Sequence, residues 1–272
     1  MGRPSLSICA LLAVRDEGPR LRFLLPRLAR LGVEVAILDN GSRDETSDLI
    51  AQHRGAPVVA SKRVPFNGHL DLAELLKAKY ALAEGLRHDW LVHYDADEWL
   101  EHADPAKSLR DAIAEAEAGG HVAINFEEFV FLPQPGEDWT DCDPLANARR
   151  YYFFAPSPNR LQRAWRRNRV RPDPAGAGHR LGVPEACLAP VSHILRHFMV
   201  LSQEHAYTKY LYRMHHPAAV ARGWHGNRLE FTRANLTLPV SSPWLRQTDS
   251  GPMDRSRPCP LHFWQWPNTR GT

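Results

Sequence analysis

Short apolar runs alternate with longer amphipathic stretches over the first hundred residues of this 272-residue chain. Strands separated by helices of this length predict βαβ units, and therefore a parallel sheet with right-handed crossovers. The strands are expected at residues 6–13, 33–38, 57–60 and 90–94, and the helices at 20–31, 44–53 and 70–86. Ligands of such open sheets bind at the carboxyl ends of the strands, so functional residues are expected there.

The pattern changes beyond Asp97, where strands and helices no longer alternate regularly. The sequence predicts helices at 105–118 and 203–213, strands at 121–131, 151–154, 160–165 and 192–200, and a lid-like loop at 133–144. Residues 239–272 carry six of the 22 prolines, and we expect them to be ordered only by docking. The predicted fold class is α/β: a mostly parallel, Rossmann-type sheet flanked by helices in 1–101, a mixed part in 102–238, and an irregular tail.

Hydrophobic residues make up 43% of the chain and charged residues 24%, enough for a sizeable core in one large domain or two small ones. This composition excludes disorder, a fibrous repeat and a disulfide scaffold. The four cysteines are scattered without a CxxC pair, which predicts free thiols in a reducing compartment. No apolar stretch approaches the roughly 18 residues that a membrane span requires. We therefore expect a soluble cytoplasmic protein, or one that contacts the inner face of a membrane peripherally.

Charge is distributed unevenly along the chain, although the formal net charge is only +3. Residues 95–148 contain fourteen acidic and two basic side chains, whereas residues 149–180 contain nine arginines and one acid. Adjacent segments of opposite charge suit a site that holds a cation and a phosphorylated ligand, and solvated faces produce the same counts. The small net charge argues against dedicated nucleic-acid binding.

The apolar strand at 90–94 runs directly into the acidic sequence Asp-Ala-Asp-Glu. In extended backbone, residues two apart project to the same side, so Asp95 and Asp97 are expected to face one ligand together. Two carboxylates at the opening of a parallel sheet suit a hard divalent cation that also bridges a diphosphate. The alternative is a solvated strand end, with Glu98 starting a turn.

A second acidic strand end lies in the sequence Leu-Asp-Asn-Gly-Ser-Arg-Asp-Glu-Thr at 38–46. Asp39 stands at the strand tip, where a carboxylate can accept hydrogen bonds from a base or a ribose hydroxyl, and we favour ligand contact for it. For Ser42, Asp44 and Thr46 we favour helix capping instead.

These two segments and the turn Val-Arg-Asp-Glu at 14–17 occur in an order and spacing that resemble bacterial family 2 glycosyltransferases of the GT-A fold. The resemblance covers about residues 5–101 and implies a nucleoside-diphosphate sugar donor with Mn²⁺ or Mg²⁺. It also implies a nucleotide pocket formed by Val14, Arg15, Glu17, Asp39 and Asp95, and a metal held by Asp95 and Asp97. Residues 1–101 are then the half that binds the nucleotide sugar, and 102–238 the half on the acceptor side.

The segment 193–205, with Lys209, is similar to part of the same bacterial enzymes. Some GT-A enzymes bring a late histidine to the metal or diphosphate, and we assign that role to His197. Arg196, Ser202 and Lys209 are the expected phosphate-binding residues. A histidine with a purely structural role is the alternative, because the chain contains 14 of them.

The general base of an inverting transferase must lie within about 3 Å of the acceptor hydroxyl. Glu127 and Glu128 lead into the 133–144 loop, and Asp138 lies within it, so these three acids are the catalytic candidates. Only one of Glu127 and Glu128 can face the site, since neighbours in a strand alternate sides. The sequence is equally compatible with inversion and retention.

The arginine-rich stretch 160–180 is the last signal, and its forked side chains suit a diphosphate or an anionic acceptor. For most of these arginines an exposed basic hairpin is the simpler interpretation, and Arg166, Arg167 and Arg169 are the ones most worth testing.

The favoured function is metal-dependent transfer of a sugar to a glycan, a lipid-linked molecule or a small-molecule acceptor. A noncatalytic nucleotide-binding or scaffold protein of this fold is one alternative, although the metal acids are present. A nucleotidyltransferase is another, although it would be expected to carry a Gly-rich basic loop after the first strand. A Rossmann oxidoreductase would need GxGxxG there, and none occurs.

Overall fold

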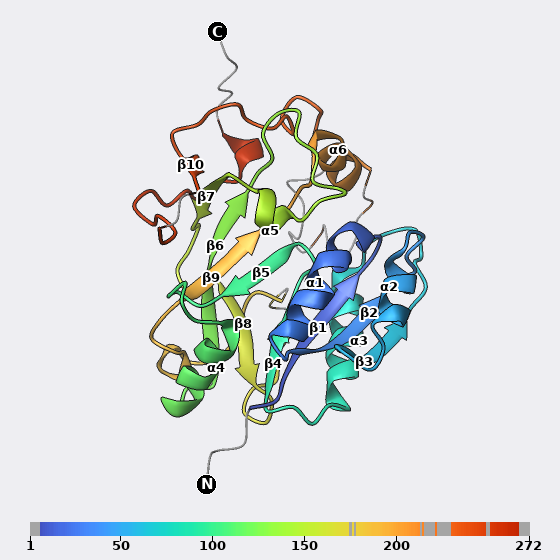
Figure 1. Cartoon of the computed structure of the whole chain (residues 1–272), viewed down its shortest axis with the longest axis vertical. Coiled ribbons are helices and arrows are strands. Elements are labelled where there is room, and N and C mark those ends of the chain that lie inside the picture. Colours follow the sequence, from blue (N-terminus) through green and yellow to red (C-terminus); the bar gives the residue numbers. More distant parts are fainter. Residues whose placement is uncertain are drawn as a thin grey trace.

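The computed structural model describes residues 6–173, 176, 178–212, 214, 221, 230–248 and 251–266. One large sheet runs through both halves of the molecule, in the strand order β10-β7-β6-β8-β4-β1-β2-β3. Figure 1 shows the N-terminal half in blue beside the green-to-red C-terminal half, and the two halves meet where β4 pairs with β8.

Four parallel strands form the N-terminal half, in the order β4-β1-β2-β3. They are β1 (Ile8–Val14), β2 (Glu34–Asp39), β3 (Val58–Arg63) and β4 (Trp90–His93), joined by α1 (Gly18–Arg30), α2 (Thr46–Gln52) and α3 (Leu72–Glu84). Side chains alternate along β1, so Ala10 and Leu12 pack with leucines of α1. Cys9 and Leu11 point to the opposite face, where Ala83 of α3 covers them. Helices therefore cover both faces of the parallel strands.

The C-terminal half is mixed. It contains β5 (Glu98–Glu101), α4 (Leu109–Ala118), β6 (Ala123–Phe131), α5 (Pro144–Asn147), β7 (Arg150–Phe154), β8 (Leu161–Arg166) and β9 (His193–His197). The long strand β6 pairs antiparallel with β8 and β7 along different parts of its length, and parallel with β9. Because β9 also pairs antiparallel with β5, the strands β5, β9 and β6 lie side by side.

The last part of the chain packs against this half. It holds the short helix η2 (Glu185–Cys187), α6 (Gln203–Leu211), β10 (Arg246–Gln247) and η4 (Phe263–Gln265). Phe263, Trp264 and Trp266 are buried in a cluster with Tyr152 of β7 and Tyr210 of α6. Apolar packing thus orders the described part of the tail. The predicted helix end at residue 213 lies outside the described residues.

The expected fold class, an α/β sheet flanked by helices with a mixed second half, is confirmed. The expectation of an extended Asp95–Asp97 segment is wrong: β4 ends at His93, the chain turns at Ala96 and Asp97, and the unpredicted strand β5 begins at Glu98. All four cysteines are free thiols, as expected. Within the described residues, no helix is both long and apolar enough to cross a membrane.

Two loops at the carboxyl end of the parallel strands are tied together. The Ser42 hydroxyl accepts from the Asp16 backbone N–H at 3.0 Å, and the Thr46 hydroxyl from the Glu17 N–H at 2.9 Å. Asp44 accepts from the N–H of Gly18, the first residue of α1, at 2.9 Å. We expected these side chains to cap α2, but its cap residue forms no side-chain cap hydrogen bond. Asp44 does accept from the N–H of Thr46, the first residue of α2, at 3.0 Å, whereas Ser42 and Thr46 accept from backbone donors of the turn before α1.

Candidate active site

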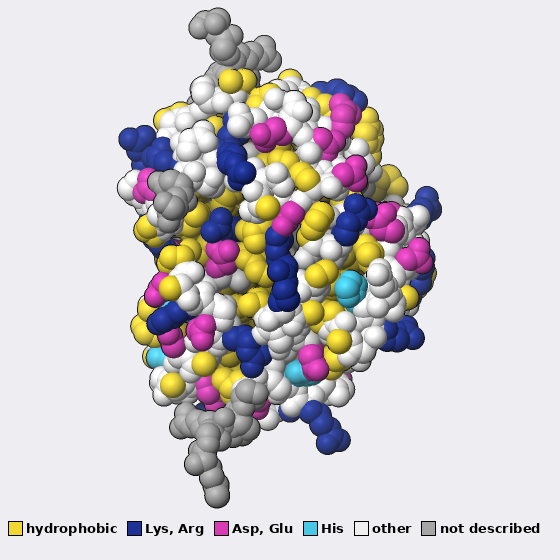
Figure 2. All heavy atoms as spheres, in the orientation of Figure 1, with side chains coloured by type: hydrophobic (Ala, Val, Ile, Leu, Met, Phe, Trp, Pro, Cys, Tyr) yellow, Lys and Arg dark blue, Asp and Glu magenta, His cyan; other side chains and the backbone are white. Residues whose placement is uncertain are grey.

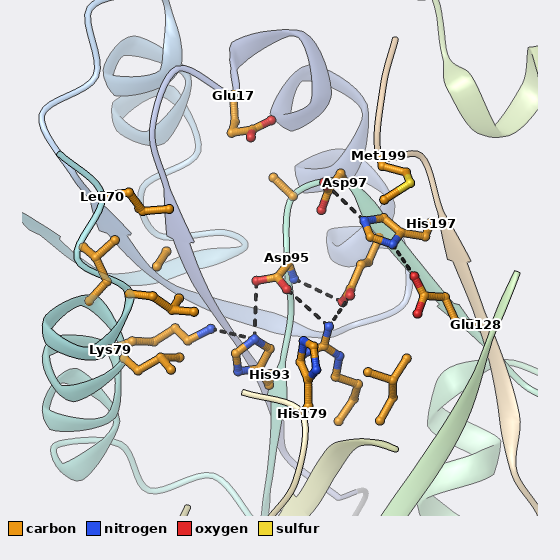
Figure 3. Close-up of a pocket in the computed structure, with 18 of the residues that line it drawn as sticks. Glu17, Leu70, Lys79, His93, Asp95, Asp97, Glu128, His179, His197 and Met199 are labelled. Atoms are coloured by element: carbon orange, nitrogen blue, oxygen red, sulfur yellow. Dashed lines mark hydrogen bonds and ion pairs between the residues drawn. The ribbon is translucent and has the colours of Figure 1, made fainter. Parts of the chain in front are cut away.

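A pocket of about 270 Å³ opens at the carboxyl ends of β1 and β4, and both halves of the sheet line it. Ala13 comes from β1, Asp95 and Asp97 from the turn between β4 and β5, Glu128 from β6 and His197 from β9. Figure 3 shows the two aspartates and His197 drawn together in this pocket. The strand ends therefore meet where open α/β sheets bind ligands.

Asp97, His197 and Glu128 form a connected row. The Nδ1 of His197 lies 2.6 Å from Oε1 of Glu128, and its Nε2 lies 3.3 Å from Oδ2 of Asp97. A carboxylate can accept from Nδ1–H at this distance, so Glu128 orients the imidazole ring. The Nε2 of His197 faces the carboxylate of Asp97, and either a proton on Nε2 or a metal cation between the two atoms would satisfy both.

Lys209 of α6 supplies a positive charge at the same end of the pocket. Its ammonium donates to Oδ2 of Asp97 at 2.6 Å and to the Met199 carbonyl at 2.8 Å. Burial of Asp97 opposes ionisation, but the charges of Lys209 and His197 hold the pKa of this carboxyl well below its usual value. Asp97 is therefore an anion at neutral pH.

Arg163 of β8 anchors the other carboxylates and is only 2% exposed. Its Nη2 donates to Asp95 at 3.3 Å and to Glu98, and its Nη1 donates to the Gly178 carbonyl at 2.7 Å. Burial raises the pKa of Glu98 to about 7, although the positive charge of Arg163 acts in the opposite direction. Burial also acts on Asp95, but His93 and Arg163 hold its pKa well below the usual value.

Lys79 and His93 form the third group of the pocket. The Lys79 ammonium lies 3.2 Å from Nε2 of His93, and the same nitrogen lies 3.3 Å from Oδ1 of Asp95. Burial, and then the charge of Lys79, lowers the pKa of His93 to about 3, so its ring is neutral at neutral pH. Burial lowers the pKa of Lys79 to about 8.

Gly178 packs against His93 in a way that no other residue could. Its φ is +75°, and a Cβ built on it would lie 2.2 Å from Cε1 of His93. Gly178→Ala should therefore lower the free energy of unfolding through both strained backbone and overpacking, each about 1–3 kcal/mol. Gly182→Ala has a similar φ of +69° and no neighbour within 4 Å, so it carries only the first cost. Urea unfolding of both variants measures the difference, and equal losses would show that the His93 contact is unimportant.

The structure brings six of the sequence-predicted site residues into one pocket, namely Glu17, Asp95, Asp97, Glu128, His197 and Lys209. Glu17 points into the pocket from the start of α1 (Figure 3), and its carboxylate accepts from the buried Arg20 at 2.6 Å. These residues converge because the β1, β4, β6 and β9 segments end around the same opening.

Three predicted nucleotide-binding residues lie outside the lining of this pocket. Val14 is buried in the core beneath α1, and its neighbour Ala13 lines the pocket in its place. Arg15 donates to the Asn40 and Gly41 carbonyls at 2.8 and 2.7 Å, which holds the loop after β2. Asp39 accepts from Ser42 and Ser47. Burial of the Asp39 carboxyl disfavours its ionised form. The hydrogen bonds from the two serines favour that form more strongly, so the pKa of Asp39 is lowered.

The remaining acidic candidates are separated. Glu128 faces the pocket, whereas Glu127 points to the other side of β6 and pairs with Arg255 at 2.5 Å. This is the alternation that the sequence predicted without identifying the inward residue. Asp138 is exposed and accepts from the Thr140 backbone and hydroxyl at 2.8 and 2.5 Å, away from the pocket lining.

Two predicted phosphate-binding residues are also occupied elsewhere. Arg196 alternates with His197 on β9, so its guanidinium points to the other face and donates to Glu101 at 2.7 Å. Ser202 caps α6 and accepts from the His205 N–H at 3.2 Å. Of the predicted phosphate-binding residues, Lys209 is the one that lines the pocket.

Sequence reasoning missed several pocket residues: Lys79, His93, Glu98, Arg160, Arg163, His179 and His262. None of the three arginines that it singled out lines this pocket: Arg166 pairs with Glu117, Arg167 donates to the His88 carbonyl, and Arg167 and Arg169 line a separate pocket. Arg163 shares one face of β8 with Leu161 and Trp165, and an arginine at an apolar period-two position is a signal of a buried partner. On the face seen in Figure 2, acidic and basic side chains are interspersed rather than gathered in a patch of one sign.

Within the described residues, no three His, Cys, Asp or Glu side chains gather as a metal-binding group. Asp97 and His197 offer two ligand atoms. Two ligands bound at right angles, each about 2.1 Å from a cation, are about 3 Å apart, close to the 3.3 Å observed. A divalent cation at these two atoms would share Oδ2 of Asp97 with the Lys209 ammonium and would take its other ligands from a substrate and water.

No protein-family model and no curated protein matches the sequence. Among solved structures, Staphylococcus aureus TarS 1–349 matches with a TM-score of 0.45 and 11% identity over 76% of this chain. Glucosyl-3-phosphoglycerate synthase from Mycobacterium tuberculosis, in complex with Mn²⁺, UDP and glucosyl-3-phosphoglycerate, matches with a TM-score of 0.31 and 20% identity over 46% of this chain. The match spans 64% of TarS 1–349 and 44% of the mycobacterial enzyme, less than two thirds of either.

Proposed function

We propose that this chain is a glycosyltransferase that uses a nucleoside-diphosphate sugar and a divalent cation, Mn²⁺ or Mg²⁺. One observation carries the proposal: Asp97 and His197, from opposite halves of the molecule, meet at the carboxyl end of a parallel sheet, and Glu128 orients the histidine. A carboxylate that fixes the second nitrogen of a histidine is the usual outer partner of a metal ligand.

The cation's contribution is to offset the negative charge that develops on the departing diphosphate. Asp97 and His197 are the residues that hold it, and Asp95 lines the same pocket two residues away. Among the described residues only these two protein atoms converge, so a bound diphosphate would supply further ligands. Binding of the cation and of the nucleotide are therefore coupled.

The chain's own cations act on the same anionic group. Lys209 is held against Asp97, is 8% exposed and lines the same pocket, so its positive charge lies beside the proposed cation. Arg160 is paired with Glu128 at the other side of His197. Both acidic and basic side chains are thus fixed by the fold before ligand arrives, which lowers the cost of organising them during the reaction. In this proposal Glu128 positions His197.

The nucleoside lies toward the loops after β1 and β2 in this proposal. Glu17 faces the pocket, and Arg15 and Asp39 fix the loop beyond it, with Asp39 retained as the contact to the base or ribose. A second pocket of about 370 Å³ shares Glu128, Arg160 and Leu161 with the first. It lies in the C-terminal half, so we assign the acceptor, whether glycan, lipid-linked or small molecule, to this side.

A nucleoside diphosphate should stabilise the protein more in the presence of Mn²⁺ or Mg²⁺ than after treatment with EDTA. A ligand that binds only the native state at 100 times its Kd contributes about 2.7 kcal/mol, which raises the Tm by several degrees. The measurement is a thermal-shift panel of UDP, GDP, ADP and CDP with and without each metal. The parent nucleosides are the controls, since they lack the group that bridges the cation. Equal shifts with and without metal would contradict the proposed cation.

A further inference from the structure

Lys79 occupies a position where a lysine is costly. It lies on the buried face of α3, in line with Leu76 and Ala83, and only 1% of it is exposed. An ammonium removed from water destabilises the folded state unless an anion or several acceptors replace the lost hydration. An apolar residue at this helix position would pack without that cost.

The partners of Lys79 do not compensate for its burial. Its ammonium contacts Nε2 of His93 at 3.2 Å, and among the described residues it forms no ion pair with a carboxylate. Asp95, the carboxylate beside His93, is already paired with Arg163. The ammonium is therefore buried beside an imidazole, without a carboxylate of its own among the described residues.

The missing counterion has room in the pocket. Figure 3 shows the Lys79 side chain extending from α3 toward His93 and Asp95, at the opposite end from His197. Leu70, Leu72 and Leu75 line the same end and are each partly buried. Apolar walls exclude water, and the attraction between an ammonium and a bound anion is stronger in such surroundings.

We propose that Lys79 is a specificity-determining residue of the donor site, whose ammonium donates to a phosphate oxygen of the bound nucleoside diphosphate. This inference rests on the proposed function and extends it to the inner end of the pocket. Lys79 is held ready by His93 and gains its anionic partner only when the ligand binds. The lysine thus costs stability in the free protein and contributes affinity for phosphate.

The test is Lys79→Met, which keeps the length of the side chain and removes its charge. The variant should bind its nucleoside diphosphate, the best of UDP, GDP, ADP and CDP, roughly 10- to 100-fold more weakly by calorimetry. Its affinity for the parent nucleoside should be unchanged, and its Tm without ligand should rise. Lys79→Arg should recover part of the lost affinity. Lys77→Met is the matched control, since Lys77 is 61% exposed on the same helix and pairs with Glu74.

Each other outcome overturns a defined part of the argument. Unchanged diphosphate affinity in Lys79→Met would remove Lys79 from the ligand and leave the proposed function standing. Equal losses for the diphosphate and the nucleoside, or a lower Tm in the variant, would show that the lysine only shapes the pocket. If the wild-type protein binds no nucleoside diphosphate more tightly than its nucleoside, the proposed function fails and this inference fails with it.

Discussion

Asp97→Asn is expected to lower the rate of sugar transfer on the order of 10²-fold or more. The substitution keeps the shape of the side chain but removes the charge that faces Nε2 of His197 and the Lys209 ammonium. The cation and the departing diphosphate are then held less firmly at the moment when charge develops. Lys209 keeps its hydrogen bond to the Met199 carbonyl, so the fold should persist.

The assay measures donor hydrolysis or transfer at saturating Mn²⁺, together with a melting curve for each protein. Asp48→Asn is the control, because Asp48 is an exposed residue of α2 outside the pocket lining. It should leave the rate unchanged. Wild-type turnover by a folded Asp97→Asn protein would refute the assignment of the cation to Asp97. A variant with a lowered Tm can be assayed below its unfolding transition, so the transfer rate still tests the assignment of the cation to Asp97.

Arg163→Met should have the largest effect on stability, a loss of about 3–5 kcal/mol in the free energy of unfolding. Removing the guanidinium leaves Glu98 buried without its partner, and the side chain of Glu98 is only 2% exposed. Burial already raises the pKa of Glu98 to about 7, and loss of Arg163 raises it further. Chemical denaturation at several pH values measures the loss.

The raised pKa of Glu98 determines how the loss of stability in Arg163→Met depends on pH. Glu98 binds a proton more readily in the folded variant than in the unfolded chain, so raising the pH through its folded pKa removes stability. The deficit of Arg163→Met should therefore be largest above pH 7 and shrink as the pH falls. Adding Glu98→Gln should restore much of the loss, whereas Arg166→Met, on the outer face of the same strand, should cost little. A deficit independent of pH and of Glu98 would mean that the arginine stabilises the fold by packing alone.

The meeting of Asp97 and His197 could be anticipated from the sequence, although the geometric reason given for the aspartates was wrong. The strand-end acids mark the opening of the sheet, and His197 falls in a segment that reads as a strand. The side chains converge because the chain turns at Ala96 and Asp97 and then forms β5, which pairs with β9. The local sequence did not predict β5. A short strand of mixed character forms only when its partner supplies the hydrogen bonds.

The contributions of Lys79 and Arg163 could not be derived from pattern alone. Lysines and arginines are usually exposed, so a basic stretch reads as a solvated face, and only the alternation of β8 separates Arg163 from Arg166. Glu127 and Glu128 pose the same problem, since register decides which one faces inward. The sequence predicted the position of Asp39 at the tip of β2. It did not predict that Ser42 and Ser47 donate hydrogen bonds to the carboxylate, because this contact depends on the folded loop.

The placement of β9 also governs when this site comes into being. This strand lies between β5 and β6, and the segments that pair there are distant in the chain. Closing such long loops costs entropy that local contacts do not offset, so pairings of this kind form late in folding. The pairings of β1 with β2 and of β2 with β3 join segments that are nearer in the chain, whereas the pairing of β1 with β4 joins Ile8 to Trp90. A chain in which β9 has not yet paired with β5 would keep His197 apart from Asp97, so the site exists only once this pairing has formed.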